Sequence, residues 1–229
     1  MFIQLKNVTK IYRGVNVETV ALKNISISFE NGEFTAIMGR SGCGKTTLLN
    51  ILGCMDTFDD GEYIFEDKNI KGCSENALAA FRNKKIGFIF QAFNLINEMT
   101  VFKNVEVPLG YAGISAKERK ERCEYLLEQV GLSDKLKNHP TQLSGGQQQR
   151  VAIARALAME PAVILADEPT GNLDSKNGTE IMELLKDMNE KGKTIIMVTH
   201  DNTLSKYAKR TVTLSDGEIV DDKINAYIK

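Results

Sequence analysis

The stretch "GRSGCGKT" at residues 39–46 constrains the fold of this chain more than any other feature. It matches the pattern GxxxxGK[ST] and lies between an apolar stretch, "GEFTAIM", and a stretch with helical spacing, "TTLLNILGCM". In that strand–loop–helix context the glycines turn backbone N–H groups around phosphate oxygens, Lys45 supplies a charge, and the Thr46 hydroxyl can ligate Mg²⁺. The pattern therefore predicts an α/β chain of the P-loop NTPase type. The predicted ATP-binding residues in and directly after this loop are Gly39, Ser41, Gly42, Cys43, Gly44, Lys45, Thr46 and Thr47.

Polar residues end three other apolar stretches. "VILADE" ends in Asp167 and Glu168, "IGFIFQ" ends in Gln91, and "IIMVTH" ends in His200. Ligands of α/β sheets bind at the carboxyl ends of the strands, so these residues support one another as a site. We expect Asp167 to hold Mg²⁺, Glu168 to act as general base for water, Gln91 to reach the metal or the water, and His200 to contact the γ-phosphate.

A second glycine loop, "LSGGQQQR" at residues 143–150, precedes the helical stretch "VAIARALAM". Glycines before a helix allow an anion to approach the helix N-terminus. Because one loop already accounts for one phosphate site, the second loop indicates either redundancy or a site built from two chains.

The order of predicted elements divides the chain. Strands dominate residues 1–38, and apolar strands alternate with amphipathic helices after Pro161, which is typical of a mostly parallel sheet. "RTVTLSDGEIV" predicts a closing β-hairpin. We expect a single domain over 1–229, with 1–91 and 161–229 forming an α/β core that carries an N-terminal antiparallel β subdomain, and with 92–160 forming an inserted helical subdomain. The alternative is that the middle helices are crossover helices of the same sheet.

Bulk properties exclude several classes of protein. The net charge is −1, with 29 basic against 30 acidic residues, which gives no support for nucleic-acid binding. The four cysteines form no CxxC pair, so neither a zinc site nor a disulfide framework is indicated and reduced thiols in a cytosolic protein are expected. The N-terminus is not a signal peptide and no apolar run is long enough to span a membrane, so any membrane role would go through a partner.

With these pieces in place, the chain resembles the nucleotide-binding domain of the ATP-binding cassette (ABC) family along essentially its whole length. The motifs occur in family order: Tyr12, the loop 39–46, Gln91, "LSGGQ", "ILADE", "GNLD" and His200. "ADEPTGNLD", "LNILGCMD" and "IGFIFQAFNLI" are similar to the subfamily that serves macrolide and antimicrobial-peptide exporters, lipoprotein-release systems and a cell-division complex.

The resemblance implies a homodimer that forms head to tail around two ATP molecules with Mg²⁺. In the family the signature loop reaches the ATP of the other chain; here that loop is Leu143, Ser144, Gly145, Gly146 and Gln147. Tyr12 would stack on adenine, Asp174 would lie at the dimer seam, and residues 92–101 would line a groove for a helix of an integral membrane permease at the inner face of the cell membrane. Arg40 and Asn172 depart from the commonest family pattern, which leaves details of the dimer contact open.

The resemblance implies an ATPase that powers export of a peptide, drug or lipid-like substrate. The alternative within the family is a mechanotransmission ATPase that controls an extracytoplasmic enzyme. A DNA- or ribosome-acting ABC protein is disfavoured by the single P-loop, the short 91–143 segment and the absence of a basic surplus, and a nucleotide sensor would show no turnover. Cys43, inside the loop, is interpreted as a small filler residue, with a reactive thiol as the competing hypothesis.

Overall fold

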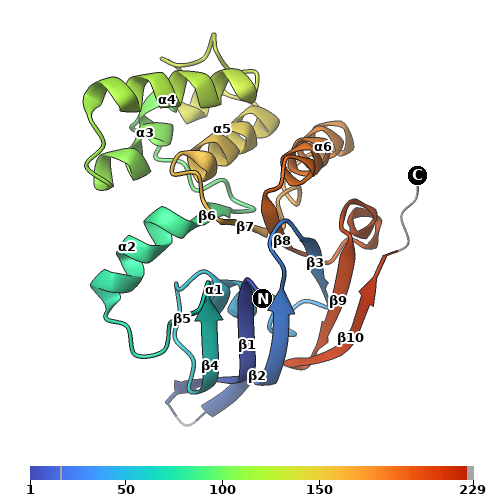
Figure 1. Cartoon of the computed structure of the whole chain (residues 1–229). Coiled ribbons are helices and arrows are strands. Elements are labelled where there is room, and N and C mark those ends of the chain that lie inside the picture. The colour runs from blue at the N-terminus through green and yellow to red at the C-terminus, as the bar shows by residue number, and fades with distance from the viewer. Residues whose placement is uncertain (16, 226–229) are drawn as a thin grey trace. The chain divides into compact units, whose positions relative to one another are not determined.

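A computed structural model describes residues 1–15 and 17–225 of the 229-residue chain (Figure 1). Two compact units make up the chain. The first comprises Met1–Ala79 and Lys186–Lys229, and the second comprises Ala80–Leu185. The expected helical segment, 92–160, lies wholly within the second unit.

The first unit contains an antiparallel sheet built from the N-terminal strands, in the order β2-β1-β4-β5 (Figure 1). Alternate residues of β1 are buried, including Ile3 and Leu5, so one face of the strand packs into the core. The register places Tyr12 of β1 opposite Thr19 of β2. The strands are β1 (Ile3–Gly14), β2 (Val17–Phe29), β4 (Asp60–Phe65) and β5 (Lys68–Asn69).

The first unit also contains four neighbouring strands in the order β10-β9-β3-β8, in which β3 pairs in parallel with β8 and β9. Every residue of β3 and β8 is buried, as expected for strands covered on both faces. The predicted hairpin is confirmed as the antiparallel β9–β10 pair. The elements are β3 (Phe34–Met38), α1 (Lys45–Leu52), β8 (Thr194–Thr199), η2 (Asn202–Tyr207), β9 (Arg210–Ser215) and β10 (Glu218–Ile224).

The second unit pairs two parallel strands, β6 and β7, with a group of helices. Helix α5 packs against α3, α4 and β6, so the helix that follows the signature loop is the centre of this unit. Ser115 caps α4 in a reciprocal capping box with Glu118, which fixes the start of this helix. The elements are β6 (Ile86–Ile89), α3 (Val101–Tyr111), α4 (Ala116–Gln129), η1 (Pro140–Gln142), α5 (Gly145–Leu157) and β7 (Val163–Asp167).

Two helices, α2 (Glu75–Lys85) and α6 (Ser175–Glu190), each span a boundary between the units. Helix α6 was expected, but α2 and α3 were not. Helix α2 has no buried residue, so its sequence carries no apolar stripe. Helix α3 buries Val101, Val105 and Leu109 at helical spacing, but Pro108 lies inside this pattern, and proline argues against a continuous helix. The expected α/β class, with an antiparallel N-terminal sheet, parallel strands and a helical region, is confirmed.

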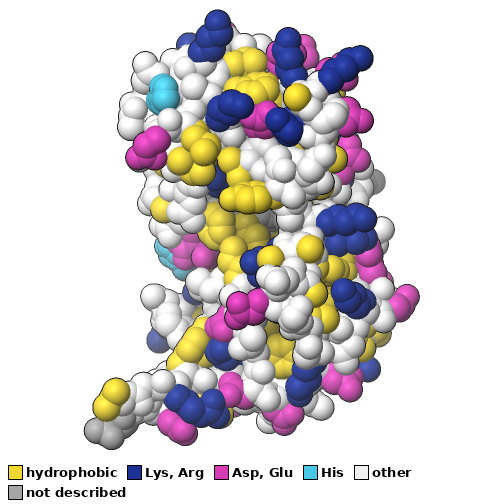
Figure 2. Space-filling model, turned by 90° about the vertical axis from the view of Figure 1, so that its left-hand side faces the viewer, with side chains coloured by type: hydrophobic (Ala, Val, Ile, Leu, Met, Phe, Trp, Pro, Cys, Tyr) yellow, Lys and Arg dark blue, Asp and Glu magenta, His cyan; other side chains and the backbone are white. Residues whose placement is uncertain are grey.

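Charged side chains of both signs are interspersed on the face shown in Figure 2, in keeping with the near-zero net charge. Among the described residues, no helix has the length and apolar character needed to cross a membrane.

Candidate active site

The predicted phosphate-binding loop, residues 39–46, follows β3 and leads into α1, as the sequence predicted. Gly44 is the N-cap residue of α1 with φ 104°, and a Cβ there would lie 2.5 Å from the carbonyl oxygen of Ala21. Only glycine fits a left-handed position with so close a neighbour. The first turn of α1 carries no acidic side chain, so the positive end of the helix dipole is unopposed. These features are compatible with an anion at the start of α1.

Lys45 lies under the loop with only 6% of its surface exposed. Its Nζ atom donates to the carbonyl oxygens of Gly39 (2.8 Å) and Arg40 (2.9 Å), which satisfies a buried charge. An ammonium has three donors, so Lys45 can bridge these carbonyls and a phosphate oxygen. Ser41 and Thr46 are exposed, which leaves both hydroxyls accessible to a ligand.

Cys43 is buried, and its sulfur lies 2.6 Å from the position that a Cβ on Gly39 would take. The backbone carbonyl of Cys43 accepts a hydrogen bond from the N–H of Gly217. The thiol thus fills space beneath the loop. This geometry supports the interpretation of Cys43 as a filler residue.

Tyr12 is anchored beside α1 by its hydroxyl group. The hydroxyl donates to Asp56 Oδ2 (2.7 Å) and also hydrogen-bonds the Thr47 side chain. Lys10 pairs with the same carboxylate (2.7 Å) and lies 4.9 Å from the Tyr12 ring centre. Burial raises the pKa of Asp56, but hydrogen bonds from Lys10, Tyr12 and the Thr57 N–H, together with the charge of Lys10, make the net shift of this pKa downward. The hydrogen bonds of its hydroxyl group fix the Tyr12 ring. Because the residue remains 42% exposed, the ring is also accessible for stacking.

Asp167 and Glu168 are half-buried at the end of β7, after four fully buried residues. Glu168 adopts φ 45°, a left-handed conformation that costs on the order of 1–3 kcal/mol for a residue with a side chain. The turn is closed by the Gly171 N–H, which donates to the Glu168 carbonyl (3.0 Å). A residue with a strained backbone and a carboxylate side chain at a strand end is a candidate functional residue.

Gln91 is exposed, two residues beyond the end of β6, and pairs with Asn172. Asn172 Nδ2 donates to the Gln91 backbone carbonyl (3.0 Å), and Gln91 Nε2 lies 3.4 Å from Asn172 Oδ1. Asn172, a departure from the commonest family pattern, thus contacts Gln91 within one chain.

Ser144 is the N-cap residue of α5. Its Oγ accepts from the Gln147 N–H (3.3 Å), and Gln147 Oε1 accepts from the Ser144 N–H (3.0 Å). A hydroxyl that accepts one bond keeps its own proton for donation, so Ser144 can cap the helix and still donate to an anion. Leu143 is buried and anchors the loop, while Gly145 is half-buried.

Gly146 is packed against α6. A Cβ on Gly146 would collide with Asn177 Oδ1 and would lie 2.8 Å from Asn177 Cγ. Asn177 in turn donates its N–H (2.9 Å) and its Nδ2 (2.7 Å) to the carboxylate of Asp174. These bonds from Asn177 lower the pKa of Asp174. The second signature glycine and the predicted seam residue are therefore linked through Asn177, which the sequence analysis missed.

His200 follows β8 directly and is exposed. Asp201, the next residue, caps the 3₁₀ helix η2 by accepting from the Thr203 N–H (2.8 Å). His139 lies in the second unit with its Nδ1 3.2 Å from the Asn97 carbonyl oxygen.

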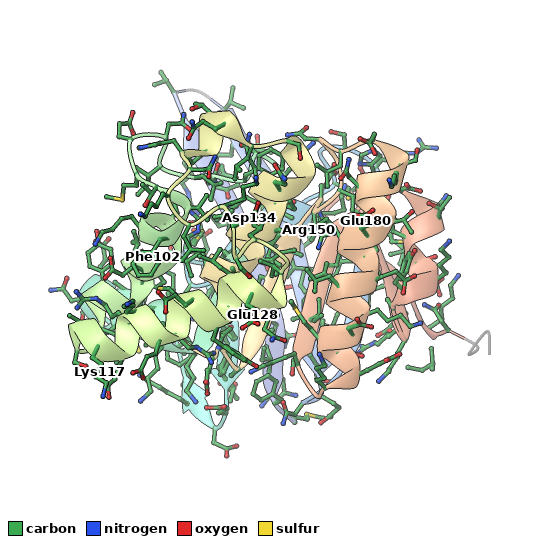
Figure 3. All side chains as sticks on the ribbon, turned by 90° about the horizontal axis from the view of Figure 1, so that it is seen from above. Phe102, Lys117, Glu128, Asp134, Arg150 and Glu180 are labelled. Carbon is green, nitrogen blue, oxygen red and sulfur yellow. The ribbon has the colours of Figure 1, made fainter. Side chains whose placement is uncertain are left out.

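Further polar residues of α5 that the sequence analysis missed also hold this region. Arg155 donates to the backbone carbonyls of Asn94 (2.5 Å) and Phe93 (2.8 Å), and both of these residues have left-handed φ angles. Burial lowers the pKa of Arg155. Arg150 and Glu180, which Figure 3 labels on α5 and α6, form an ion pair (2.8 Å). Arg150 and Arg155 act through partners that lie far from them in the sequence, so no local sequence pattern could have revealed these roles.

Within the described residues, no three His, Cys, Asp or Glu side chains come together as a metal site. The candidate metal ligands, Thr46 of the first unit and Gln91 and Asp167 of the second, offer a hydroxyl, an amide oxygen and one carboxylate. Mg²⁺ is typically bound through one or two carboxylates together with substrate phosphates and water, so these are donor types that Mg²⁺ accepts.

Comparison with known proteins identifies the chain. The sequence profile described as ABC transporter matches residues 22–171. The chain is 55% identical to an uncharacterized ABC transporter ATP-binding protein, MJ1508, of Methanocaldococcus jannaschii, over 96% of this chain and 98% of that protein. It is 48% identical to the macrolide export ATP-binding/permease protein MacB of Mannheimia succiniciproducens, over 96% of this chain but only 34% of that protein.

A solved structure extends this likeness to the fold. The chain is 46% identical, with a TM-score of 0.90, to the ATP-binding cassette MJ0796, described as a dimer in a post-hydrolysis state bound to ADP and Pi; the match covers 97% of this chain and 98% of that one. The chain therefore belongs to the ABC transporter family, as an ATP-binding subunit with ATPase activity.

Proposed function

We propose that this chain works as a head-to-tail dimer around two ATP molecules and powers a separate membrane permease that exports its substrate. The proposal is based on one observation: two helices of the chain, α1 and α5, begin after a glycine or serine cap and have no acidic side chain in the first turn. Such helix N-termini suit anion binding. The dimeric state of the solved relative and the combined ATP-binding/permease name of the MacB relatives support it.

The nucleotide is held by the first unit in this proposal. The loop N–H groups, Lys45 and the dipole of α1 bind the phosphates, and Tyr12 stacks on adenine with its hydroxyl restrained by Asp56. Base–aromatic stacking is worth about 1–3 kcal/mol per base, enough to matter for affinity.

Thr46, Asp167 and Gln91 would hold Mg²⁺, which would neutralise charge on the phosphates when bound. Glu168 accepts a proton from the attacking water, and His200 orients that water and the terminal phosphate. Ser144 and Gly146 of one copy donate to the terminal phosphate held by the other, and Asp174 lies at the seam. Closing of this dimer by ATP and its opening after hydrolysis supply motion to the permease.

The permease contact is proposed for the segment 92–101, which follows Gln91. Ile96 and Met99 of this segment are exposed apolar side chains, a composition suited to docking a helix. The segment begins in the turn held by Arg155, so it is presented on a fixed backbone.

The test is the variant Glu168→Gln. It should lose turnover, retain ATP and elute as a dimer in ATP-saturated size-exclusion chromatography, because the amide cannot take the proton but keeps the side-chain shape. Glu183→Gln, an exposed carboxylate on α6, is the matched control and should keep wild-type turnover. A Glu168→Gln protein that stays monomeric with ATP bound would refute the dimer.

A further inference from the structure

Gln149 is a fully buried amide in the second turn of α5, with 0% of its surface exposed. Its Nε2 atom donates to the carbonyl oxygen of Pro169 at 2.6 Å and lies 3.4 Å from the carbonyl oxygen of Phe90. A buried amide side chain is costly unless it is hydrogen-bonded, so these two contacts explain why it is tolerated.

The two carbonyls belong to residues beside the proposed catalytic groups. Pro169 follows Glu168, and Phe90 precedes Gln91. Glu168 has the left-handed φ of 45°, and a residue in such a conformation persists only where its surroundings hold it there. The bond to the Pro169 carbonyl fixes the backbone one residue beyond this strained position.

The other half of the amide has no partner. Gln149 Oε1 is buried and lacks a hydrogen-bond partner among the described residues. Because both facing atoms are carbonyl oxygens, the NH₂ group must point toward them and the oxygen must point away. One buried acceptor is thus left without a partner, while the NH₂ group contacts two backbone carbonyls. This indicates that the NH₂ group, rather than the amide oxygen, is the part of Gln149 that this position requires.

We propose that Gln149 is a positioning residue for ATP hydrolysis: it holds the backbones next to Glu168 and Gln91 in the geometry that the reaction needs. This inference rests on the proposed roles of those two residues. Gln149 belongs to α5, the helix that begins at the signature loop, so one side chain ties that helix to both backbones. A displacement of α5 is therefore transmitted to both.

The experiment replaces Gln149 with methionine, which has a similar shape but no donor. The kcat for ATP should fall on the order of 10²-fold, the loss typical of a reacting group misplaced by about 1 Å. The Kd for ATP should stay within about twofold of wild type, because the loop 39–46 is untouched. Gln129→Met, at an exposed position on α4, is the matched control and should keep the wild-type kcat.

A double-mutant cycle separates positioning from general loosening. In a Glu168→Asp background, where the carboxylate is already displaced, Gln149→Met should cost less than about threefold in kcat. An equal fold-loss in both backgrounds would show that Gln149 acts only on structure and would overturn the proposal. If Gln149→Met does not fold, Gln149→Asn, which retains the amide but is too short to bridge, replaces it in the same cycle.

The two proposals fail in different ways. Wild-type kcat in a folded Gln149→Met or Gln149→Asn protein would overturn the positioning role while Glu168→Gln stays inactive. Normal turnover by Glu168→Gln would instead refute the proposed role of Glu168 itself.

Discussion

The substitution Gly146→Ala tests whether the second signature glycine is needed for packing within one chain. The new Cβ would collide with Asn177 Oδ1 and lie 2.8 Å from Cγ and 3.2 Å from Cβ of Asn177. Overpacking of this kind destabilises a fold by about 1–3 kcal/mol, and the higher helix propensity of alanine than of glycine offsets at most about 1 kcal/mol of that. We expect a net destabilisation of about 1–2 kcal/mol, which for a chain of this size lowers Tm by about 2–8 °C.

The assay is thermal unfolding of the isolated chain without nucleotide, where dimer formation around ATP plays no part. Asn177→Ala removes the colliding Oδ1 and Cγ atoms and leaves only the 3.2 Å Cβ contact, which a shift of a few tenths of an ångström relieves. The double variant should therefore be more stable than Gly146→Ala alone. Asn177→Ala by itself should lose little, because the backbone N–H of residue 177 still caps against Asp174.

Two results would refute this reasoning. One is a Gly146→Ala protein with the wild-type Tm. The other is a double variant no more stable than Gly146→Ala, since the cost would then not arise from Asn177. Either result would restrict the role of Gly146 to the approach of a phosphate.

Two further predictions concern stability. Arg155→Lys should lower the free energy of unfolding by about 1–3 kcal/mol in chemical denaturation. The reason is that an ammonium cannot reproduce the two guanidinium hydrogen bonds to the carbonyls of Phe93 and Asn94, which both have left-handed φ angles. An unchanged denaturation midpoint would show that these two hydrogen bonds do not stabilise the fold. Asp56→Asn should reduce the loss of stability at acid pH. Despite burial, which raises it, the pKa of Asp56 is lowered from 3.8, chiefly by hydrogen bonding to Lys10. The contribution of Asp56 to the free energy of unfolding is therefore present above about pH 4 and disappears as the pH falls through the lowered pKa. Wild type should thus lose more stability than Asp56→Asn between about pH 5 and pH 2, as measured by denaturant titration, and parallel profiles would exclude this contribution.

Local signals predicted the parts of the site that depend on neighbours in sequence. The spacing of Gly39, Gly44 and Lys45 specifies a loop that must lie between a strand and a helix, and the structure confirms that position. The Asp-Gly turn before β10 was found in the same way. Each of these features is determined by backbone conformations and hydrogen bonds within a few residues.

Helices α2 and α3 escaped prediction for different reasons: α2 has no buried stripe, and the apolar pattern of α3 is interrupted by Pro108 and by a buried polar residue. Helix α2 buries no residue, and α3 is held at its start by an internal contact: Asn104 is fully buried and bonds the backbone of the loop at 96–100. A buried asparagine does not differ from an exposed one in a sequence.

The sequence by itself determined the chemistry available to this protein: a phosphate loop, a carboxylate at a strand end and a glycine-led helix. Only the tertiary structure decided how these groups are held, since Gln149, Arg155 and Asn177 act on backbone and side chains that are distant in the chain or belong to other elements. The physical reason is that a polar side chain gains its role from which partners burial leaves it, and those partners are set by packing rather than by sequence spacing.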